Sequence, residues 1–357
     1  MGKTIRILYV DPLSPPGHIN FNNIYISALS AISGVKIDFC FQEGYIDKLT
    51  IFEDVVNQKF CFSKSRRTYR GILNKVFWRL HQLGVLFYCK KIIREFRYDY
   101  VFFSSFDEIA LVLSGLMKTN VLAVCHANAE HIPKSRMSML AHRRLSRKGN
   151  LITLNKALSN FMAMNGIKNV YSPHGFPDVE QKNIINSRFV FVPVQANMVD
   201  TKLLKELLNS DFSKLLQQLH VRFVLKDNPA LPHDLPNVVF TEKMLSKLDY
   251  DSYFGEAGLI VLPYRKEMYV YRTSAMLMES VAFGKNVALP KAKSFVSLSC
   301  EGDKGLFFYD DSKDLLRIIK RLYTTDDIPF PDFANMKRQN SREMIAKIIE
   351  NIFNENS

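Results

Sequence analysis

The segment from residue 261 to 288 holds side chains suited to binding a diphosphate. It reads VLPYRKEMYVYRTSAMLMESVAFGKNVA, in which an apolar strand leads into a polar loop and then into a helix. The loop ends in Arg272, Thr273 and Ser274, so a cation and two hydroxyls come directly before the predicted helix. A helix start offers unpaired backbone N–H groups and the positive end of the helix dipole, and both favour phosphate oxygens. The segment therefore predicts a phosphate site.

One acidic residue lies a short way into the same predicted helix. Glu279 follows Ser274 by five residues, which places it one to two turns into the helix. A carboxylate can accept hydrogen bonds from the two neighbouring hydroxyls of a ribose while the helix start holds the phosphates. The two features together indicate a nucleoside diphosphate. The plainer interpretation is that Glu279 and Arg272 are solvated surface residues.

Three further ionisable residues stand at or just after the ends of predicted strands in the first half of the chain. They are His18, Asp107 and His126. Each has a side chain that can take a proton from an acceptor hydroxyl, so each is a candidate general base. A histidine after a strand is also often a packing or loop residue, and the sequence does not rank the three.

Short apolar runs alternate with helical segments through the first half of the chain. We expect strands at 5–10, 35–41, 100–103, 121–125, 151–154 and 170–171, with helices at 21–32 and 107–117. Strands that are apolar throughout and separated by helices are typical of a parallel sheet covered on both faces. The first half is therefore predicted to be Rossmann-like.

The same alternation starts again after a polar interruption around 172–186. We expect strands at 189–193, 221–225, 238–240, 259–262 and 286–289, with helices at 200–219, 246–255, 273–283 and 334–353. The sequence thus predicts an α/β protein of two Rossmann-like doubly wound domains that face a central cleft. We place an N-terminal domain at 1–180 and a C-terminal domain at 187–333, and expect the helix within 334–357 to cross back to the first domain.

Composition excludes several classes of protein. The five cysteines are dispersed and form no C-x-x-C pair, which fits a reducing cytoplasm and predicts no metal site. No segment approaches the ~18 to 20 apolar residues of a spanning helix, and the N-terminus lacks the pattern of a signal peptide. Residues 1 to 185 hold 25 Lys and Arg against 13 Asp and Glu, and residues 186 to 357 hold 23 against 22, so the halves carry +12 and +1. A one-sided excess indicates a surface that faces polyanions.

The basic excess is concentrated in two segments. Residues 63–70 read SKSRRTYR and precede apolar residues at helical spacing, and residues 143–148 read RRLSRK. One interpretation is peripheral docking on the anionic inner face of the cell membrane. The other is a helix whose apolar side faces the core and whose basic rim is solvated.

The block at 262–287 resembles the donor-binding half of glycosyltransferase-B enzymes, particularly family-four-like bacterial polysaccharide and lipopolysaccharide transferases. The matching elements are Leu-Pro-Tyr at 262 to 264, Arg-Thr-Ser at 272 to 274, Glu279, and Ala-Phe-Gly-Lys-Asn-Val at 282 to 287. The resemblance implies that Tyr264 and the Arg-Thr-Ser turn contact the donor and that Glu279 holds its ribose.

Other elements follow the order of that family over most of the chain. Gly17 lies in what looks like the glycine loop after the first strand, and His126 lies where these enzymes often have a histidine that faces the donor sugar. Ser-Pro-His-Gly-Phe at 172 to 176 resembles the His-Gly signature before the linker. Lys226 is similar to the family's basic residue near the diphosphate, although a strand-end lysine is commonly just solvated.

One position departs from the family pattern. Retaining members pair two glutamates, and the residue eight before Glu279 is Tyr271. The implied mechanism is the departure of a nucleoside diphosphate stabilised by Lys226, Arg272 and the helix start, which requires no divalent metal and no cofactor.

The expected function is transfer of a sugar from a nucleotide-diphosphate sugar to a glycan or lipid-linked acceptor in surface polysaccharide synthesis. A nucleotide-sugar epimerase of similar architecture would use the same phosphate turn and Glu279. Tyr271 also leaves open a non-catalytic, transferase-like partner subunit. A nucleic-acid-binding protein is the remaining alternative, but the chain carries no zinc finger, helix-turn-helix or RNA-binding aromatic signature, so no nucleic acid is expected.

Overall fold

The computed structural model describes residues 4–50, 56–63, 71–116, 120–179, 187–324 and 330–355. The chain folds into two compact units. Unit 1 comprises Met1–Gly175 and Asn340–Ser357, and unit 2 comprises Phe176–Gln339. The chain therefore leaves unit 1 once and returns to it with its last helix. Among the described residues, no helix combines the length and the apolar character needed to cross a bilayer.

Unit 1 is built on a parallel sheet. In the part of the chain that the structure describes, this sheet has seven strands in the order β3-β2-β1-β4-β5-β6-β7. The strands are β1 (Ile5–Val10), β2 (Val35–Gln42), β3 (Val56–Phe62), β4 (Tyr100–Phe103), β5 (Asn120–Cys125), β6 (Asn150–Thr153) and β7 (Asn169–Tyr171). The strand order reverses between β1 and β4. Doubly wound sheets bind ligands at such a point, outside the carboxyl ends of the strands.

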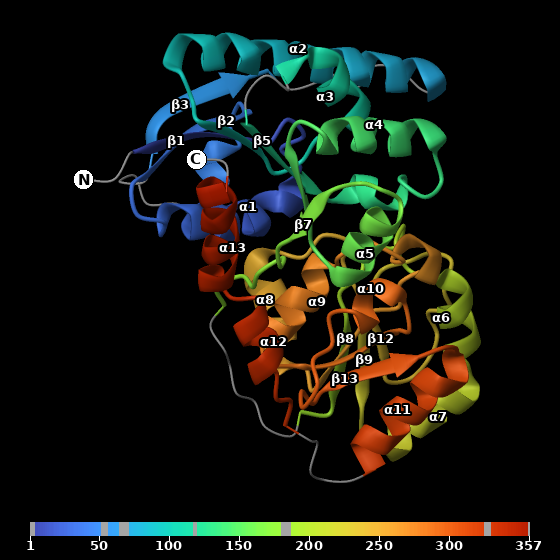
Figure 1. Ribbon diagram of the computed structural model, residues 1–357. Coiled ribbons are helices and arrows are strands. Elements are labelled where there is room, and N and C mark those ends of the chain that lie inside the picture. Colours follow the sequence, from blue (N-terminus) through green and yellow to red (C-terminus); the bar gives the residue numbers. More distant parts are fainter. Residues whose placement is uncertain are drawn as a thin grey trace. The chain divides into compact units, whose positions relative to one another are not determined.

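Helices cover both faces of this sheet. They are α1 (Ile19–Ser30), α2 (Gly71–Phe96), α3 (Glu108–Ser114), α4 (Arg136–Ser146), α5 (Lys156–Met164) and α13 (Arg342–Glu355). Helices α1 and α13 lie side by side on one face, where Ile24 and Ile345 share a core with Tyr9 of β1. Helix α2 covers the other face, since Cys89 Sγ lies 3.7 Å from Cys40 Sγ of β2 (Figure 1).

Unit 2 repeats the plan. Within the described residues its sheet has six parallel strands in the order β10-β9-β8-β11-β12-β13. The strands are β8 (Phe189–Val192), β9 (Arg222–Lys226), β10 (Val238–Thr241), β11 (Leu259–Val261), β12 (Asn286–Pro290) and β13 (Leu306–Tyr309). The helices are α6 (Thr201–Leu207), α7 (Ser210–Gln218), α8 (Lys247–Glu256), α9 (Ala275–Ala282), α10 (Lys293–Val296), α11 (Ser312–Thr324) and α12 (Ala334–Gln339). Here the strand order reverses between β8 and β11.

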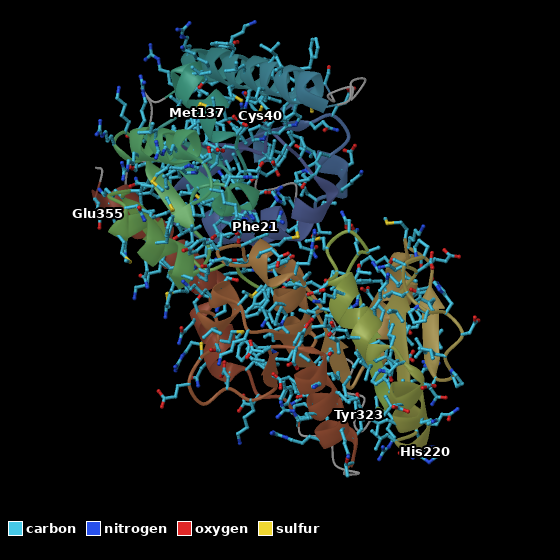
Figure 2. All side chains as sticks on the ribbon, turned by 90° about the vertical axis from the view of Figure 1, so that its right-hand side faces the viewer. Phe21, Cys40, Met137, His220, Tyr323 and Glu355 are labelled. Carbon is cyan, nitrogen blue, oxygen red and sulfur yellow. The ribbon has the colours of Figure 1, made fainter. Side chains whose placement is uncertain are left out.

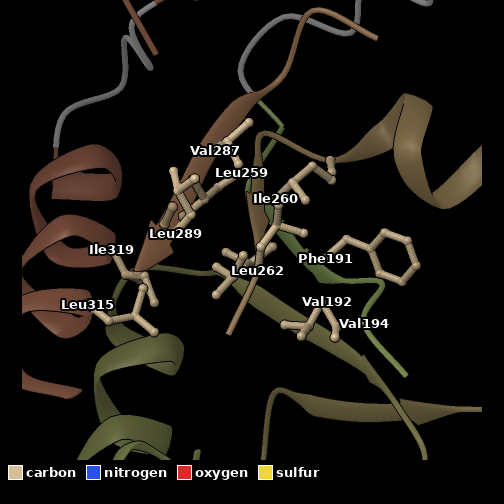
Figure 3. Packing of buried hydrophobic residues seen from close by; sticks show 14 of the residues in the cluster. Phe191, Val192, Val194, Leu259, Ile260, Leu262, Val287, Leu289, Leu315 and Ile319 are labelled. Atoms are coloured by element: carbon tan, nitrogen blue, oxygen red, sulfur yellow. The ribbon is translucent and has the colours of Figure 1, made fainter. Parts of the chain in front are cut away.

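The central strands of unit 2 form its core. Phe191 of β8 and Ile260 of β11 are completely buried, and Leu289 of β12 packs toward Leu315 and Ile319 of α11 (Figure 3). Each such side chain stabilises the fold by about 1.5–3 kcal/mol through removal of apolar surface from water. A rigid sheet results, and it fixes where the loops after its strands begin.

The predicted α/β class with two Rossmann-like domains is confirmed. The strands expected from apolar runs are all present, each within one or two residues of its predicted bounds. The sequence reading missed β3 and β13, which lie at sheet edges. Their sequences are VNQKFCF and LFFY, and the first contains three polar residues while the second is mostly half-buried. Neither has the fully buried pattern that marks a central strand.

Two long helices expected from the sequence are each interrupted. The helix expected at 200–219 is α6 followed by α7, because Asn209 accepts a hydrogen bond from Phe212 N and caps a new helix. The helix expected at 334–353 is α12 followed by α13, with the break at 340–341. Helix α12 belongs to unit 2 and α13 to unit 1.

Candidate functional site

The loops that follow β8 and β11 in unit 2 are tied to one another. Asp200 N donates a 2.7 Å hydrogen bond to Pro263 O, and Val199 forms an isolated bridge with Tyr264. The Arg265 guanidinium donates to Asn197 O at 3.0 Å. These contacts hold the carboxyl-end loops at the point where the strand order reverses, which is where a ligand is expected in this class of sheet.

Helix α9 begins at Ala275, two residues after the predicted start at 273. Ser274 has an extended backbone, and its hydroxyl accepts a 3.2 Å hydrogen bond from Leu277 N, so Ser274 is the N-cap. Its Oγ also lies 3.0 Å from the hydroxyl of Tyr264. Because Ser274 is only 3% exposed, its hydroxyl shapes the helix start from within.

Tyr264 likewise lies in the core of unit 2. It is 3% exposed, and its ring stacks on Tyr269 with 4.1 Å between centroids. Tyr264 is therefore better placed to support Ser274 from within the core than to make the donor contact that the resemblance implied. By contrast, Arg272 and Thr273 are half-buried and Ala275 is exposed, so the start of α9 borders solvent.

Glu279 lies one turn into α9 and is held by a residue of another helix. The hydroxyl of Tyr250, on α8, donates a 2.7 Å hydrogen bond to Glu279 Oε2. In the described part of the chain no donor reaches Oε1, and this oxygen is not sealed from solvent. Lys226, the last residue of β9, places its Nζ 5.5 Å from the centre of the Tyr250 ring. We call Lys226, Tyr250 and Glu279 the carboxylate cluster.

Burial dominates the electrostatics of the carboxylate cluster. It raises the pKa of Glu279 against the opposing hydrogen bond from Tyr250, and it lowers the pKa of Lys226 against the attraction of Glu279. The pKa of Tyr250 is raised by burial first and by the Glu279 charge second. Both charged side chains are thus poorly solvated, and a ligand that offered hydroxyls to the acid and anionic oxygens to the lysine would compensate them.

A second group of ionisable residues lies at the carboxyl edge of the sheet in unit 1. Asp11, directly after β1, is completely buried and accepts hydrogen bonds from Ser14 N at 2.9 Å, from Asn22 Nδ2 at 2.9 Å and from the Ser105 hydroxyl. Burial opposes ionisation, but the partners, His18 first, lower the pKa of Asp11. The His18 Nδ1 lies 3.4 Å from Asp11 Oδ2, so the imidazole and the carboxylate form a close pair.

Three imidazoles of unit 1, those of His18, His126 and His174, lie around Phe21 of α1. The rings of His18 and His126 stack with 4.5 Å between centroids, and Phe21 packs edge-on against His126 at 4.2 Å. Figure 2 labels Phe21. His174 lies against the same Phe21 at 5.2 Å, and its Nδ1 is 3.2 Å from Gly175 O. Burial lowers the pKa of His174 to about 4. The structure thus brings the side chains of His18 and His126 together.

Asp107 and Gly17 occupy different surroundings. Asp107 caps α3, since its Oδ1 accepts from Ala110 N at 2.8 Å, and its Oδ2 lies 3.3 Å from Arg79 Nε. Both carboxylate oxygens of Asp107 are therefore engaged in structural contacts, so Asp107 is better suited to be a helix cap than a general base. Gly17 is exposed, and a Cβ built on it would meet nothing within 4 Å.

Two residues of these groups escaped the sequence analysis. Asp11 is the first polar residue after an apolar strand, and this position could have marked it. Tyr250 carries no such signal, because it lies on α8 and only the packing of α8 beside α9 brings it to Glu279.

The sequence matches no protein-family model and none of the curated proteins. Among solved structures, HepE of Anabaena in complex with UDP-glucose is similar over 98% of this chain and 100% of its own, with a TM-score of 0.65 and 16% identity. The glycotransferase of kitacinnamycin covers 98% of this chain and 99% of its own, with a TM-score of 0.57 and 11% identity. The UDP-GlcNAc 2-epimerase from Neisseria meningitidis bound to UDP-GlcNAc covers 99% and 100%, with a TM-score of 0.60 and 11% identity. This chain therefore has the two-domain fold of the glycosyltransferase-B type.

Proposed function

We propose that the protein is a glycosyltransferase that takes its sugar from a nucleotide-diphosphate donor. The observation that carries this proposal is the carboxylate cluster beside the start of α9. Glu279 is fixed through Oε2 by Tyr250, so Oε1 is available to a ribose hydroxyl. Lys226 and the start of α9 offer positive potential to the diphosphate on the same sheet edge. Two of the similar structures contain a UDP-sugar, which supports this choice of donor.

In the proposed reaction an acceptor hydroxyl attacks the anomeric carbon of the donor sugar. The bond between that carbon and the diphosphate oxygen breaks, and the nucleoside diphosphate leaves with the electron pair. Lys226, Arg272 and the N–H groups at the start of α9 stabilise the departing charge, so no metal ion is needed. The acceptor proton passes to a base, for which unit 1 offers His18 next to Asp11, or His126. The acceptor is a glycan or a lipid-linked sugar.

Epimerisation of a nucleotide sugar is the second candidate. The similarity to the Neisseria epimerase is as extensive as that to the glycotransferase. The same carboxylate cluster would hold the nucleotide in both reactions, but an epimerase needs no acceptor. Incubation with UDP-GlcNAc alone, followed by proton NMR of the sugar, separates the two. A new epimer without release of UDP would replace the transferase proposal.

The proposed function is tested first by nucleotide binding and then by turnover. Thermal shift against uridine, guanosine and thymidine diphosphates, with EDTA present, should show stabilisation by at least one of them. The protein should then consume the matching nucleotide sugar slowly by hydrolysis, and faster by transfer when an acceptor is added. Stabilisation only by DNA or RNA would contradict the proposed function. Nucleotide binding that disappears when EDTA is added would contradict the proposed metal independence.

A further inference from the structure

One side of α2 carries large apolar side chains that stay substantially exposed in the described part of unit 1. Five large apolar side chains between Val76 and Tyr88 are exposed: Val76 (49%), Phe77 (46%), Leu80 (56%), Phe87 (53%) and Tyr88 (36%). Helical spacing at 100° per residue puts these residues within one third of the helix circumference. Single exposed apolar residues are ordinary, but five on one side of one helix form a patch.

Helix α2 contributes a different side to the core of unit 1. Val85, Leu86, Cys89 and Ile92 are at most 4% exposed and face the sheet. The apolar residues at helical spacing after 63–70 include Val76, Phe77 and Leu80, and for these exposed residues the core-facing interpretation is wrong. Helix α2 thus carries a second apolar side that unit 1 leaves in contact with solvent.

Neighbouring helices extend the patch. Helix α3 packs against both α2 and α4, so the three helices form one surface layer of unit 1 (Figure 1). Leu113 of α3 is 64% exposed, and Met137 and Leu140 of α4 are 61% and 62% exposed. We call the exposed apolar residues of α2, α3 and α4 the outer apolar face.

The outer apolar face is bordered by positive charge. Helix α2 ends in Lys90, Lys91 and Arg94, which line a surface hollow of about 460 Å³ together with Phe87 and Glu95. Helix α4 and the residues after it add exposed Arg136, Arg143, Arg144, Arg147 and Lys148, and the sequence of α4 contains no acidic residue. Apolar side chains rimmed by Lys and Arg are complementary to an anionic bilayer, which offers an apolar interior below negative headgroups.

We infer that the outer apolar face docks unit 1 on an anionic lipid bilayer. The apolar side chains of α2 and α4 enter the interface, and the surrounding Lys and Arg contact the headgroup phosphates. Nucleic acid would satisfy the charges but would gain nothing from the exposed Leu80, Phe87 and Leu140. This inference does not depend on the donor site in unit 2, because it concerns unit 1 alone.

Vesicle flotation of the full chain tests the inference. The probes are vesicles of phosphatidylcholine alone and vesicles of equal parts phosphatidylcholine and phosphatidylglycerol, at low and at high salt. We expect the protein to float only with the anionic vesicles and to be released by salt, which screens the charges. The double variants Leu80→Ser/Phe87→Ser and Lys91→Glu/Arg94→Glu should each lower binding at least about tenfold. All four side chains are exposed, so the variants should keep the wild-type Tm.

Matched changes in unit 2 serve as controls. Lys313→Glu/Lys320→Glu makes the same change of net charge on exposed positions of α11, and Leu248→Ser/Phe330→Ser removes two exposed apolar side chains. Both controls should float like the wild type. The inference is overturned if the wild type does not bind anionic vesicles at low salt, or if the controls lose as much binding as the variants of the outer apolar face. Binding to single-stranded RNA in place of vesicles would overturn it as well.

Discussion

The hydroxyl of Tyr250 donates a 2.7 Å hydrogen bond to Glu279 Oε2 and so joins α8 to α9. The two residues are 29 positions apart in the chain, and β11 lies between α8 and α9 in the sequence. The bond fixes the rotamer of Glu279 while its other carboxylate oxygen is left for a ligand. Tyr250 is therefore a positioning residue of the proposed donor site.

Tyr250→Phe should weaken nucleoside diphosphate binding. The change removes one hydrogen bond to a carboxylate and leaves the ring in place, which corresponds to a loss of about tenfold in affinity. Isothermal titration calorimetry measures the effect. Tyr253→Phe is the matched control, since Tyr253 lies on the same helix and packs against Phe189 and Phe191 through its ring. Equal affinities for the two variants would remove Tyr250 from the site.

Nucleotide affinity should depend on pH through Glu279. Burial raises the pKa of this carboxyl above its usual 4.5, so it takes up a proton at a higher pH than an exposed glutamate does. A protonated Glu279 accepts hydrogen bonds less well, and affinity should fall as the pH is lowered through that raised pKa. Titrations over a pH series should show this fall in the wild type, and Glu279→Gln should abolish it. An identical pH profile for the variant would exclude Glu279 as the titrating group.

The stability of unit 1 should fall in acid because of His174. Its folded-state pKa of about 4 lies below the value of about 6.5 for an unfolded histidine, so the folded state resists protonation. The associated stability is fully present above pH ~6.5 and is lost toward pH ~4, by about 3 kcal/mol. Denaturant unfolding at several pH values measures the loss. His174→Gln should make the curve flatter over this window, and a curve parallel to the wild type would refute the assignment.

Gly175 should not tolerate a side chain. Its φ is +81°, and an added Cβ would lie 2.4 Å from Ile24 Cγ2 and 3.0 Å from Ile345 Cδ1. Gly175→Ala should therefore destabilise the protein by about 2–5 kcal/mol through strain and overpacking. Gly166→Ala is the control, because Gly166 has a φ of +68° but open space around it. It should cost only about 1–2 kcal/mol. Similar losses of Tm for both would show that the contacts with α1 and α13 do not matter.

Sequence reasoning recovered the parts of the fold that have one strong signal. Central strands such as Ile5–Val10 are buried on both faces, so their apolar runs stand out. The edge strand β3 forms through its pairing with β2, and the helix breaks at Asn209 because this residue caps a new helix. Neither feature has a strong local sequence pattern. Helix α2 was recognised as apolar and basic, but its two apolar sides could be told apart only once Cys89 was seen to face the sheet.

The residues of the candidate site differ in how strongly the sequence marks them. Lys226 was predicted from its similarity to the family's basic residue near the diphosphate, and Glu279 from its distance to the helix start; the structure places both beside Tyr250. Tyr264 and Ser274 have the right chemistry for a ligand, but the same chemistry serves a buried cap. Sequence alone does not distinguish a hydroxyl that faces a ligand from one that faces the core.

The most direct test of the account is the affinity of the protein and of Glu279→Ala for the nucleoside diphosphate that stabilises it most, measured by calorimetry with EDTA present. Glu301→Ala, an exposed acid of the same unit, is the control. If a ribose is held by Glu279, the alanine variant should bind at least about tenfold more weakly than the wild type and the control should bind equally well. Unchanged affinity in Glu279→Ala, or no binding of any nucleoside diphosphate to the wild type, would contradict the proposed donor site.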